Sequence, residues 1–512
     1  MAVIVGVGPL TEQDVIDVAR QGAPVELSRD ALAAIATSRE VIERLADDVE
    51  PHYGISTGFG ALATTHIPLE MRAQLQRSLV RSHAAGSGPE VEREVVRALM
   101  LLRLSTLATG RTGIRAAVAD TLARLLNAGV TPVVHEFGSL GCSGDLAPLS
   151  HVALVLMGEG RARLASGEVV DGGTALASIG LAPIELREKE GLALINGTDG
   201  MLGQLLLACN DFDMLLRTAD ITAAMSVEAM LGTSAVFAAD LHALRPQPGQ
   251  AVAAANMRAL LADSPIMASH AGPDCVYVQD AYSMRCAPQV AGAGRDTLAH
   301  ARMIAGYELA SAVDNPVVTL DGRVESNGNF HGAPVAYVLD FLAIPAADLA
   351  SMSERRTDRM LDVSRSRGLP PFLADDPGVD SGHMIAQYTQ AALVSEMKRL
   401  AVPASVDSIP SSAMQEDHVS MGWSAARKLR RSIDALSQVL AIELLTAARA
   451  LNLRAPLQPG PATGAVVAAL RERVPAPGPD RFLAPDIEAA VELVRTGAAL
   501  TAANSALPSP LR

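Results

Sequence analysis

The feature that most constrains the fold is the spacing of apolar residues in four long segments. Apolar residues recur at i, i+3 and i+4 through residues 91–109, 114–128, 201–231 and 418–453. This is the spacing of one face of an α-helix. Aromatic residues make up only 3% of the chain and hydrophobic residues 49%, so the core must be built from Ala, Leu and Val. Such a core suits closely packed helices, and the sequence predicts a mainly helical protein.

Shorter elements are predicted around these segments. Thr11 and Ser28 are typical helix N-cap residues, and apolar residues at helical spacing follow each of them. Strand-like residues are confined to short pieces such as 163–170 and 317–320, and an Asp-Gly turn signal follows each piece. We expect these strands to form small hairpins and not a central sheet.

The charge and cysteine content argue against several protein classes. The chain has 42 basic and 56 acidic residues, a net charge of −14, and no basic run that could bind nucleic acid or an acidic membrane. The best membrane candidate, 221–239, contains Glu228 and is better suited to a buried helix. Four cysteines without CxxC spacing, and a start with no basic residue before Arg20, favour a cytoplasmic protein.

Common cofactor motifs are absent from the sequence. The 11 histidines include no HExxH or other close ligand pair, so no metal site is predicted. The sequence contains no P-loop and no GxGxxG motif between a strand and a helix, so nothing in it indicates nucleotide binding. Pyridoxal phosphate needs a Schiff-base lysine, and none of the three lysines lies in a glycine-rich loop. We therefore expect no metal, nucleotide or pyridoxal phosphate.

The most unusual segment is 138–149, Gly-Ser-Leu-Gly-Cys-Ser-Gly-Asp-Leu-Ala-Pro-Leu. One interpretation is a loop that enters a helix, with Asp145 as the N-cap, because glycine allows unusual backbone angles and aspartate caps helices. The other is that Cys142, Ser143 and Gly144 form a tight turn that brings the nitrogen of Gly144 against the carbonyl carbon of Cys142. That close approach requires the small size of glycine.

This segment resembles the Ala-Ser-Gly signature of the histidine and aromatic amino acid ammonia-lyase family. In that family the tripeptide cyclises and loses two waters, which forms the prosthetic group 4-methylideneimidazol-5-one. The chain departs from the pattern with Cys142 in place of Ala. Because the cyclisation uses the backbone carbonyl of that position, we expect the departure to be tolerated, with Ser143 supplying the methylidene carbon.

Six further segments agree with the family in order and approximate spacing, and the resemblance covers roughly residues 11–453. They are 53–60, 194–198, 279–285, 314–316, 328–331 and 415–420. The resemblance implies a long-helix bundle of the fumarase/aspartase-like type, with a loop-rich N-terminal active-site region.

Three regions are predicted along the chain. Residues 1–110 form an N-terminal region that carries active-site loops, and residues 111–455 form a central helical bundle with the Cys142-Ser143-Gly144 loop. Residues 456–512 form a C-terminal helical segment and tail. Pro- and Ala-rich stretches near the start of this last region set it off from the bundle.

The resemblance also implies roles for individual residues. Tyr53 matches the catalytic base, a role that needs a phenol pKa well below about 10. Arg285 matches the residue that binds the substrate carboxylate, because a guanidinium gives bidentate geometry. The other implied residues orient the prosthetic group and the substrate or form the pocket wall: Asn196, Gln279, Tyr282, Asn315 and Phe330. Tyr282 is also predicted to be catalytic.

Two residues indicate the substrate. His83, in Ser-His-Ala-Ala-Gly, resembles the form found in histidine-specific members, and Glu416, in Gln-Glu-Asp-His, offers a carboxylate that suits an imidazole. Glu416 is predicted both to bind the substrate and to take part in catalysis. The resemblance implies anti-elimination of ammonia from L-histidine to trans-urocanate. It also implies a homotetramer whose active sites combine loops from more than one subunit.

Other functions are compatible with the same sequence. A tyrosine or phenylalanine ammonia-lyase would use the same prosthetic group, as would an aminomutase that returns the ammonia at the β-carbon. A helical scaffold or binding protein that kept the fold and lost the chemistry is a third alternative. Such a protein has no physical need for a cyclising tripeptide together with Tyr53 and Arg285.

Overall fold

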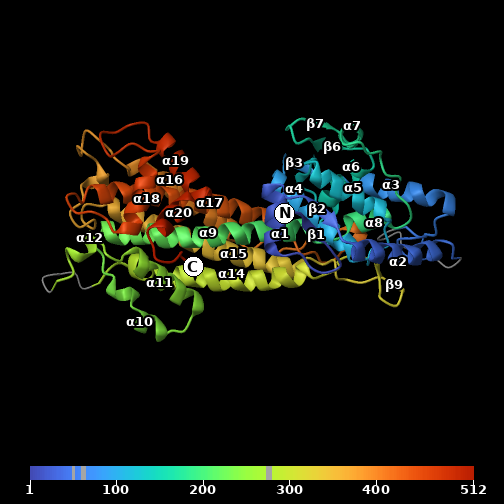
Figure 1. The fold of residues 1–512 in the computed structure, drawn as a ribbon, viewed down its shortest axis with the longest axis horizontal. Coiled ribbons are helices and arrows are strands. Elements are labelled where there is room, and N and C mark those ends of the chain that lie inside the picture. The colour runs from blue at the N-terminus through green and yellow to red at the C-terminus, as the bar shows by residue number, and fades with distance from the viewer. Residues whose placement is uncertain (49–51, 59–64, 273–278) are drawn as a thin grey trace. The chain divides into compact units, whose positions relative to one another are not determined.

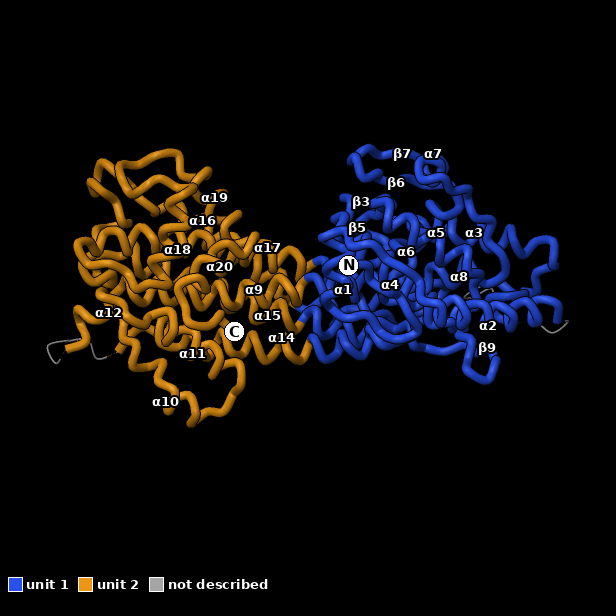
Figure 2. Tube along the Cα trace, in the orientation of Figure 1, with its two compact units in different colours: residues 1–207, 302–340, 403–427 blue, residues 208–301, 341–402, 428–512 orange. Residues whose placement is uncertain are grey.

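The computed structural model describes residues 1–48, 52–58, 65–272 and 279–512, which form 20 α-helices and nine short strands (Figure 1). The chain divides into two compact units (Figure 2). Unit 1 comprises Met1–Leu207, Arg302–Asp340 and Pro403–Arg427, and unit 2 comprises Ala208–Ala301, Phe341–Val402 and Lys428–Arg512. Each unit is thus assembled from segments that are far apart in the sequence. The three predicted regions follow the chain order and stay a prediction.

Unit 1 contains eight of the shorter helices. They are α1 (Glu12–Ile16), α2 (Arg29–Ala46), α3 (Arg72–His83), α4 (Arg93–Ala108), α5 (Ala116–Asn127), α6 (Leu146–Leu156), α7 (Gly172–Ser178) and α8 (Glu190–Ile195). The predicted N-caps are confirmed, because the Thr11 hydroxyl accepts from the Asp14 backbone N–H and Ser28 caps α2 in the same way. Helices α4 and α5 confirm two of the four predicted segments. Every residue of α4 from Val95 to Ala108 is buried.

The strands of the described residues form four small sheets, as the sequence predicts. Strands β1 (Val3–Val5) and β2 (Val25–Leu27) are parallel, and β3 (Ser87–Glu90) pairs with β5 (His135–Phe137) in antiparallel fashion. Strands β6 (Arg161–Arg163) and β7 (Val169–Asp171) form a hairpin, to which β4 (Thr131–Pro132) adds a third strand. Its turn lies inside the predicted strand-like piece 163–170, and the expected turn at Asp171-Gly172 is wrong, because Asp171 instead caps α7. The second predicted hairpin pairs β8 (Val317–Val318) with β9 (Val324–Glu325).

Unit 2 is built on four long helices, whose remaining residues belong to unit 1. They are α9 (Asp199–Ala229), α14 (Ala287–Leu309), α15 (Ala333–Leu361) and α17 (Gly422–Asn452). Buried polar contacts join three of them: Glu443 of α17 accepts from Ser226 of α9 and from Arg356 of α15. The other helices of unit 2 are shorter: α10 (Ala239–Ala243), α11 (Pro248–Leu260), α12 (Pro265–Ala268), α13 (Tyr282–Arg285), α16 (Met384–Leu400), α18 (Pro461–Arg471), α19 (Ala484–Arg495) and α20 (Ala498–Ser505). Single turns of 3₁₀- or π-helix occur at Asp17–Gln21, Leu69–Met71, Ala235–Phe237, Pro371–Leu373 and Ser412–Met414.

The apolar spacing predicted α9 and α17 but not α14 or α15. Helix α15 contains Pro345, and its exposed face carries large apolar residues, so its polar and apolar positions do not alternate clearly. It is the one helix among the described residues that is long and apolar enough to cross a membrane, yet 61% of its apolar window is buried inside the protein. Such burial is typical of a core helix.

Candidate active site

A cavity of about 950 Å³ lies within unit 1 and brings together most of the predicted site residues. The predicted residues in its wall are Tyr53, His83, Cys142, Ser143, Asn196, Asn315, Phe330 and Glu416. They come from separate loops and helix ends, so the fold of unit 1 creates a site that no single stretch of sequence contains.

Gly144 occupies a backbone position that excludes a side chain. Its φ is +76°, and a Cβ atom added there would lie 2.0 Å from the carbonyl oxygen of Gly197. The two glycines form an isolated parallel bridge, and the backbone N–H of Asp145 donates to the Gly197 carbonyl at 2.8 Å. The backbone after Ser143 is therefore packed directly against Gly197, and only glycine fits at position 144.

Asp145 has a different role from the predicted helix cap. It occupies the N-cap position of α6, but its side chain makes no cap hydrogen bond to that helix. Its carboxylate instead accepts from the backbone N–H groups of Gly200 and Met201, in the first turn of α9, at 2.8 and 2.9 Å. The Ser139 hydroxyl donates to it at 3.1 Å. Complete burial raises the pKa of Asp145 to about 7.

The residues present fit the implied 4-methylideneimidazol-5-one group. Ser143 lies in the cavity wall, and Gly144 has a positive φ and no room for a side chain. Asn196 is 2% exposed, and its Oδ1 atom has no hydrogen-bond partner among the described residues. A buried amide oxygen without a partner is costly, so this atom is suited to accept from a group in the cavity.

The departure from the family signature, Cys142, is also buried in the cavity wall. Its side chain is 7% exposed, and burial raises the pKa of the thiol to about 12, with the negative charge of Glu416 adding to the shift. The sulfur therefore stays a neutral thiol at physiological pH. A neutral thiol is a poor nucleophile.

Asn196 and Asn315 form an amide pair at the cavity. The Asn196 Nδ2 atom donates to the backbone carbonyl of Asn315 at 2.9 Å. The Asn315 Oδ1 atom accepts from the backbone N–H of Asn327 at 3.0 Å, so the second amide is fixed by the loop that precedes Phe330. The two amides are thus held in one arrangement, with the Asn196 oxygen left for a ligand.

His83 and Glu416 lie in the wall of the same cavity. His83 ends α3, and its Nδ1 atom is 2.9 Å from the Leu79 carbonyl oxygen, which can only accept, so Nδ1 carries a proton. Burial lowers the pKa of His83, which keeps the imidazole neutral and leaves Nε2 as an acceptor. The Glu416 carboxylate accepts from the Ser411 hydroxyl at 2.6 Å.

Tyr53 lies in the turn before Thr57, and both residues line the cavity. The predicted loop 53–60 extends beyond this turn, and its residues Phe59 and Gly60 lie outside the described residues. Two wall residues were not assigned a role from the sequence, although they belong to segments that were singled out. His331 and His418 stack with ring centroids 5.6 Å apart and an interplanar angle of 5°.

Gln279, Tyr282 and Arg285 lie outside the unit that contains this cavity. They belong to unit 2, and none of them is among the described residues that line the cavity. Tyr282 is 70% exposed, and the Arg285 guanidinium lies 4.8 Å from the centre of its ring. The loop is held from within unit 2, because Asp280 accepts from Arg367 at 2.8 Å.

Side chains of the usual metal-binding types are not grouped in the described part of the chain. Within 1–48, 52–58, 65–272 and 279–512, no three His, Cys, Asp or Glu side chains are placed to hold a metal ion. The expectation that the site uses no metal continues to rest on the sequence.

Comparisons with known proteins agree with this arrangement. The family model for aromatic amino acid lyases matches residues 10–472. The histidine ammonia-lyases of Streptomyces avermitilis and Streptomyces coelicolor are 68% and 66% identical to the chain; the first match covers 98% of both chains, the second 100% of this chain and 99% of the relative.

Solved structures agree as well. A tyrosine aminomutase from Streptomyces globisporus superimposes with a TM-score of 0.94 at 40% identity, covering all of both chains. The histidine ammonia-lyase of Trypanosoma cruzi gives 0.91 at 39% identity, covering 99% of this chain and 96% of that one. These matches confirm the predicted mainly helical lyase fold, and the chain belongs to the aromatic amino acid lyase family.

Proposed function

We propose that the chain is a histidine ammonia-lyase, which eliminates ammonia from L-histidine to give trans-urocanate, the opening step of histidine breakdown. One observation carries the proposal: Ser143, His83 and Glu416 line a single cavity. The tripeptide serine and the two residues that indicate an imidazole substrate therefore meet where one small molecule can contact all three. The high identity to two Streptomyces proteins of this name supports the same activity.

The prosthetic group proposed for this site is 4-methylideneimidazol-5-one, formed from Cys142, Ser143 and Gly144. When present, it supplies an electrophilic carbon that amino acid side chains do not offer. The chain's own part is to hold the loop for cyclisation. Gly197 packs against Gly144. Asp145, the next residue, is hydrogen-bonded to the first turn of α9 and so holds the end of the loop in place.

Glu416 and His83 are proposed to recognise the imidazole of the substrate. A half-buried carboxylate is satisfied by the imidazole N–H of histidine, whereas a phenyl ring would leave it without a partner. The neutral His83 has an acceptor nitrogen available, because its Nδ1 proton is directed at the Leu79 carbonyl. Phe330 forms part of the apolar wall of the same cavity.

The β-proton of the substrate is scarcely acidic, so the elimination needs a base. We assign this role to Tyr53, which lies in the cavity wall with Ser143. Its phenolate form would take the proton while the Asn196 oxygen and the Asn315 amide hold the reacting groups in position. Tyr282 is proposed as a second catalytic residue.

The proposed assembly is a homotetramer in which Gln279, Tyr282 and Arg285 of one subunit complete the cavity of another. One observation supports it: Tyr282 is 70% exposed. In addition, Tyr337, Phe341 and Ile344 form an apolar stripe along the outside of α15, with exposed fractions of 48%, 44% and 52%. Stripes of this kind commonly mark a protein interface.

The proposed location is the cytoplasm. Cys142 and Cys286 are free thiols, as is usual in a reducing compartment. The net charge of −14 supports small-molecule chemistry over binding to nucleic acid or to an acidic membrane.

An aminomutase or an aromatic lyase is the second candidate. It is favoured by the close superposition of the tyrosine aminomutase structure, because lyases and mutases can share a scaffold and a prosthetic group. The two activities differ in product: a lyase releases ammonia and the conjugated acid, and a mutase returns the amine at the β-carbon.

Turnover of L-histidine, L-tyrosine and L-phenylalanine in parallel, followed by the absorbance of each conjugated acid, tests the proposal. We expect turnover of histidine alone, and nearly complete loss of it in Ser143→Ala. In Glu416→Gln we expect kcat/KM for histidine to fall by about 10²-fold, and the exposed Glu488→Gln serves as the control. Turnover of an aromatic substrate instead would overturn the assignments of His83 and Glu416. Full activity of Ser143→Ala would overturn the prosthetic group.

A further inference from the structure

A group of fully buried charges lies beneath the amide pair of the cavity. Lys189, Arg103 and Asp314 are each 0% exposed, and Asp199 is 5% exposed. The Lys189 Nζ atom is 2.5 Å from a carboxylate oxygen of Asp314. None of the steps assigned to the cavity uses these groups, so their presence requires another explanation.

Stability alone does not explain a fully buried ion pair. Removing two charges from water is unfavourable, and a protein with well-packed apolar residues of similar volume in their place is often as stable or more so. Lys189 also has a left-handed backbone, with φ of 67°, which is unfavourable for a residue with a side chain. The position is thus costly in two ways, and a benefit should lie in what the pair holds together.

The pair joins the two chain segments that carry the cavity amides. Lys189 immediately precedes α8, which leads directly to Asn196. Asp314 precedes Asn315, and its second carboxylate oxygen accepts from the Asn315 backbone N–H at 2.8 Å. One ion pair therefore connects the start of the Asn196 segment to the base of the Asn315 segment.

Arg103 connects the same two segments at their other ends. Its guanidinium donates to the carbonyl oxygens of Asn196, at 2.7 Å, and Val313, at 3.0 Å. The two cations thus fix residues 189–196 and 313–315 relative to each other at separate points. The hydrogen bond from Asn196 to the Asn315 carbonyl lies between these points.

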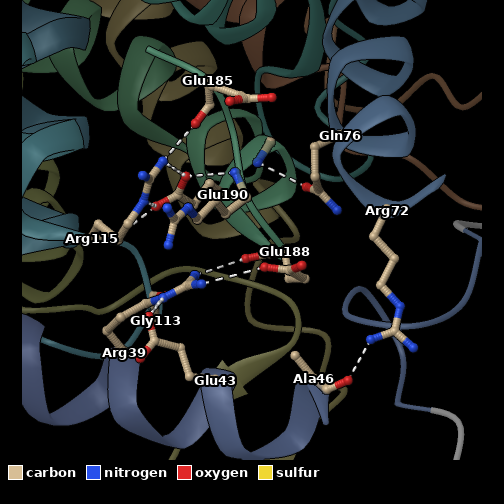
Figure 3. A network of polar contacts seen from close by, with 12 residues as sticks. Arg39, Glu43, Ala46, Arg72, Gln76, Gly113, Arg115, Glu185, Glu188 and Glu190 are labelled. Atoms are coloured by element: carbon tan, nitrogen blue, oxygen red, sulfur yellow. Dashed lines mark hydrogen bonds and ion pairs between the residues drawn. The ribbon is translucent and has the colours of Figure 1, made fainter. Parts of the chain in front are cut away.

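The start of α8 is fixed on its other side by a polar network (Figure 3). Glu190 is fully buried and accepts from Arg115 at 2.8 and 2.7 Å, while the Gly191 backbone N–H donates to Gln76 at 2.9 Å. Arg39 donates to the Glu188 carbonyl at 3.1 Å. Lys189 is therefore anchored by neighbours on both sides, so its ammonium is a fixed point from which the Asp314 segment can be positioned.

We propose that Lys189, through its ion pair with Asp314, is a positioning residue that sets the Asn196–Asn315 amide pair for the reaction. This inference rests on the proposed function and goes beyond it by assigning a role to a residue that does not touch the cavity. A small displacement of groups that orient a substrate can cost about 10²-fold in rate. Loss of the ion pair should therefore reduce turnover while the fold and the tripeptide loop persist.

The test uses Lys189→Met, Asp314→Asn and the double variant in the full-length protein. Asp314→Asn keeps an acceptor for the Asn315 N–H, and the double variant leaves no buried charge without a partner. Three properties are measured: intact mass for the loss of two waters, Tm, and kcat and KM for L-histidine. The matched control is Arg295→Met, which breaks the ion pair of Arg295 and Asp220 within unit 2.

We expect Lys189→Met to keep the mass deficit and to lose about 10²-fold in kcat, with a much smaller change in KM. The double variant should recover Tm but not kcat, whereas a purely structural role predicts that the two recover together. The control should keep its kcat. A folded Lys189→Met with kcat near that of the wild type overturns the inference, as does joint recovery in the double variant. Failure of all three variants to fold would also overturn it, because the pair would then serve folding.

The wild-type protein separates this inference from the proposed function. If it carries the mass deficit but does not convert L-histidine, the proposed substrate is wrong. The variants are then compared on the amino acid that the wild type does convert. The inference about Lys189 fails only by the behaviour of the variants relative to an active wild type.

Discussion

At the scale of single residues, Cys142 and Gly144 show which positions of the tripeptide can vary and which cannot. The proposed cyclisation uses the carbonyl of residue 142, while Gly144 has no room for a Cβ atom. A side chain is therefore free to vary at the first position of the tripeptide and not at the third. The thiol present here is buried, and its pKa is raised to about 12, so its reactivity as a nucleophile is low.

Replacing Cys142 with Ala should leave the prosthetic group and the activity in place. We expect the mass deficit to persist and kcat/KM for L-histidine to stay within about threefold of the wild type, because only one buried sulfur is removed. Intact mass and steady-state kinetics measure these two properties. Gly144→Ala is the contrasting variant, and its added methyl group should abolish the mass deficit.

Loss of the deficit in Cys142→Ala would show that the thiol takes part in forming the group. Alkylation gives a second measurement on the native protein. A thiol with so high a pKa should react with iodoacetamide far more slowly than an exposed model thiol.

The individual site residues could be predicted from the sequence, but their proximity in one cavity could not. Residues 53, 83, 143, 196, 315 and 416 were selected by their resemblance to a family, since no spacing rule connects positions so far apart. Lys189 gave no signal of its own, because a buried lysine and a solvent-exposed lysine look alike in a sequence. Its role becomes visible only when its distance to Asp314 is known.

At the scale of elements, Asp145 links two helices through one carboxylate. It precedes α6 and accepts from the first turn of α9, where a helix N-terminus favours negative charge. Burial nevertheless dominates and raises the pKa from 3.8 to about 7. Folding is therefore coupled to protonation at this position.

Asp145→Asn should remove this pH dependence. Between pH 3.8 and about 7 the unfolded carboxyl group ionises while the folded one keeps its proton, so the wild type loses stability as the pH rises through this window. The asparagine does not titrate and keeps an acceptor for α9. The free energy of unfolding of the variant relative to the wild type should therefore rise with pH by a few kcal/mol, on the order of 1.4 kcal/mol for each pH unit of the window, and level off above about pH 7. The Tm difference should follow the same course.

Thermal unfolding of both proteins across this window measures the effect. Asp171→Asn is the matched control, because Asp171 caps α7 on the surface and hydrogen bonds from Thr174 lower its pKa. Because the pKa of Asp171 is lowered in the folded protein, its contribution changes only at the acid end of the window and with the opposite sign, so Asp171→Asn should not gain stability relative to the wild type as the pH rises. Parallel Tm curves for Asp145→Asn and the wild type would contradict the assignment.

The helices were predictable where one face is apolar and the opposite face is polar. Segments 91–109 and 201–231 became α4 and α9 with ends shifted by a few residues, since apolar spacing follows directly from burial of one face. Helix α14 was missed because glycines interrupt its pattern, and α15 because Tyr337, Phe341 and Ile344 place apolar residues on its exposed face. The hydrogen bonds of Asp145 to α9 were likewise beyond local spacing, which pointed only to α6.

At the scale of the whole molecule, the proposed active site needs more than one chain. Mixing Ser143→Ala subunits with Arg285→Ala subunits tests this directly. Each parent should be nearly inactive, but a site that takes its tripeptide from one subunit and its arginine from another can be intact in a mixed tetramer. Random assembly at equal amounts should restore roughly a quarter of the wild-type activity.

The measurement is the rate of urocanate formation after unfolding and joint refolding, or after co-expression. Parents mixed without exchange of subunits are the control and should stay inactive. A site built from a single chain would give no restored activity in any mixture, and that result would remove the shared-site proposal while leaving the lyase assignment intact.

The contact between Gly144 and Gly197 has a consequence for how such a protein can be followed in a cell. Gly197 lies two residues before the start of α9, so the tripeptide loop reaches its tight conformation only when that part of the chain has docked. If the tripeptide then cyclises as proposed, the two missing waters are a permanent chemical record of a single folding event. A mass spectrum of fully denatured chains would count how many molecules had once passed through the native arrangement.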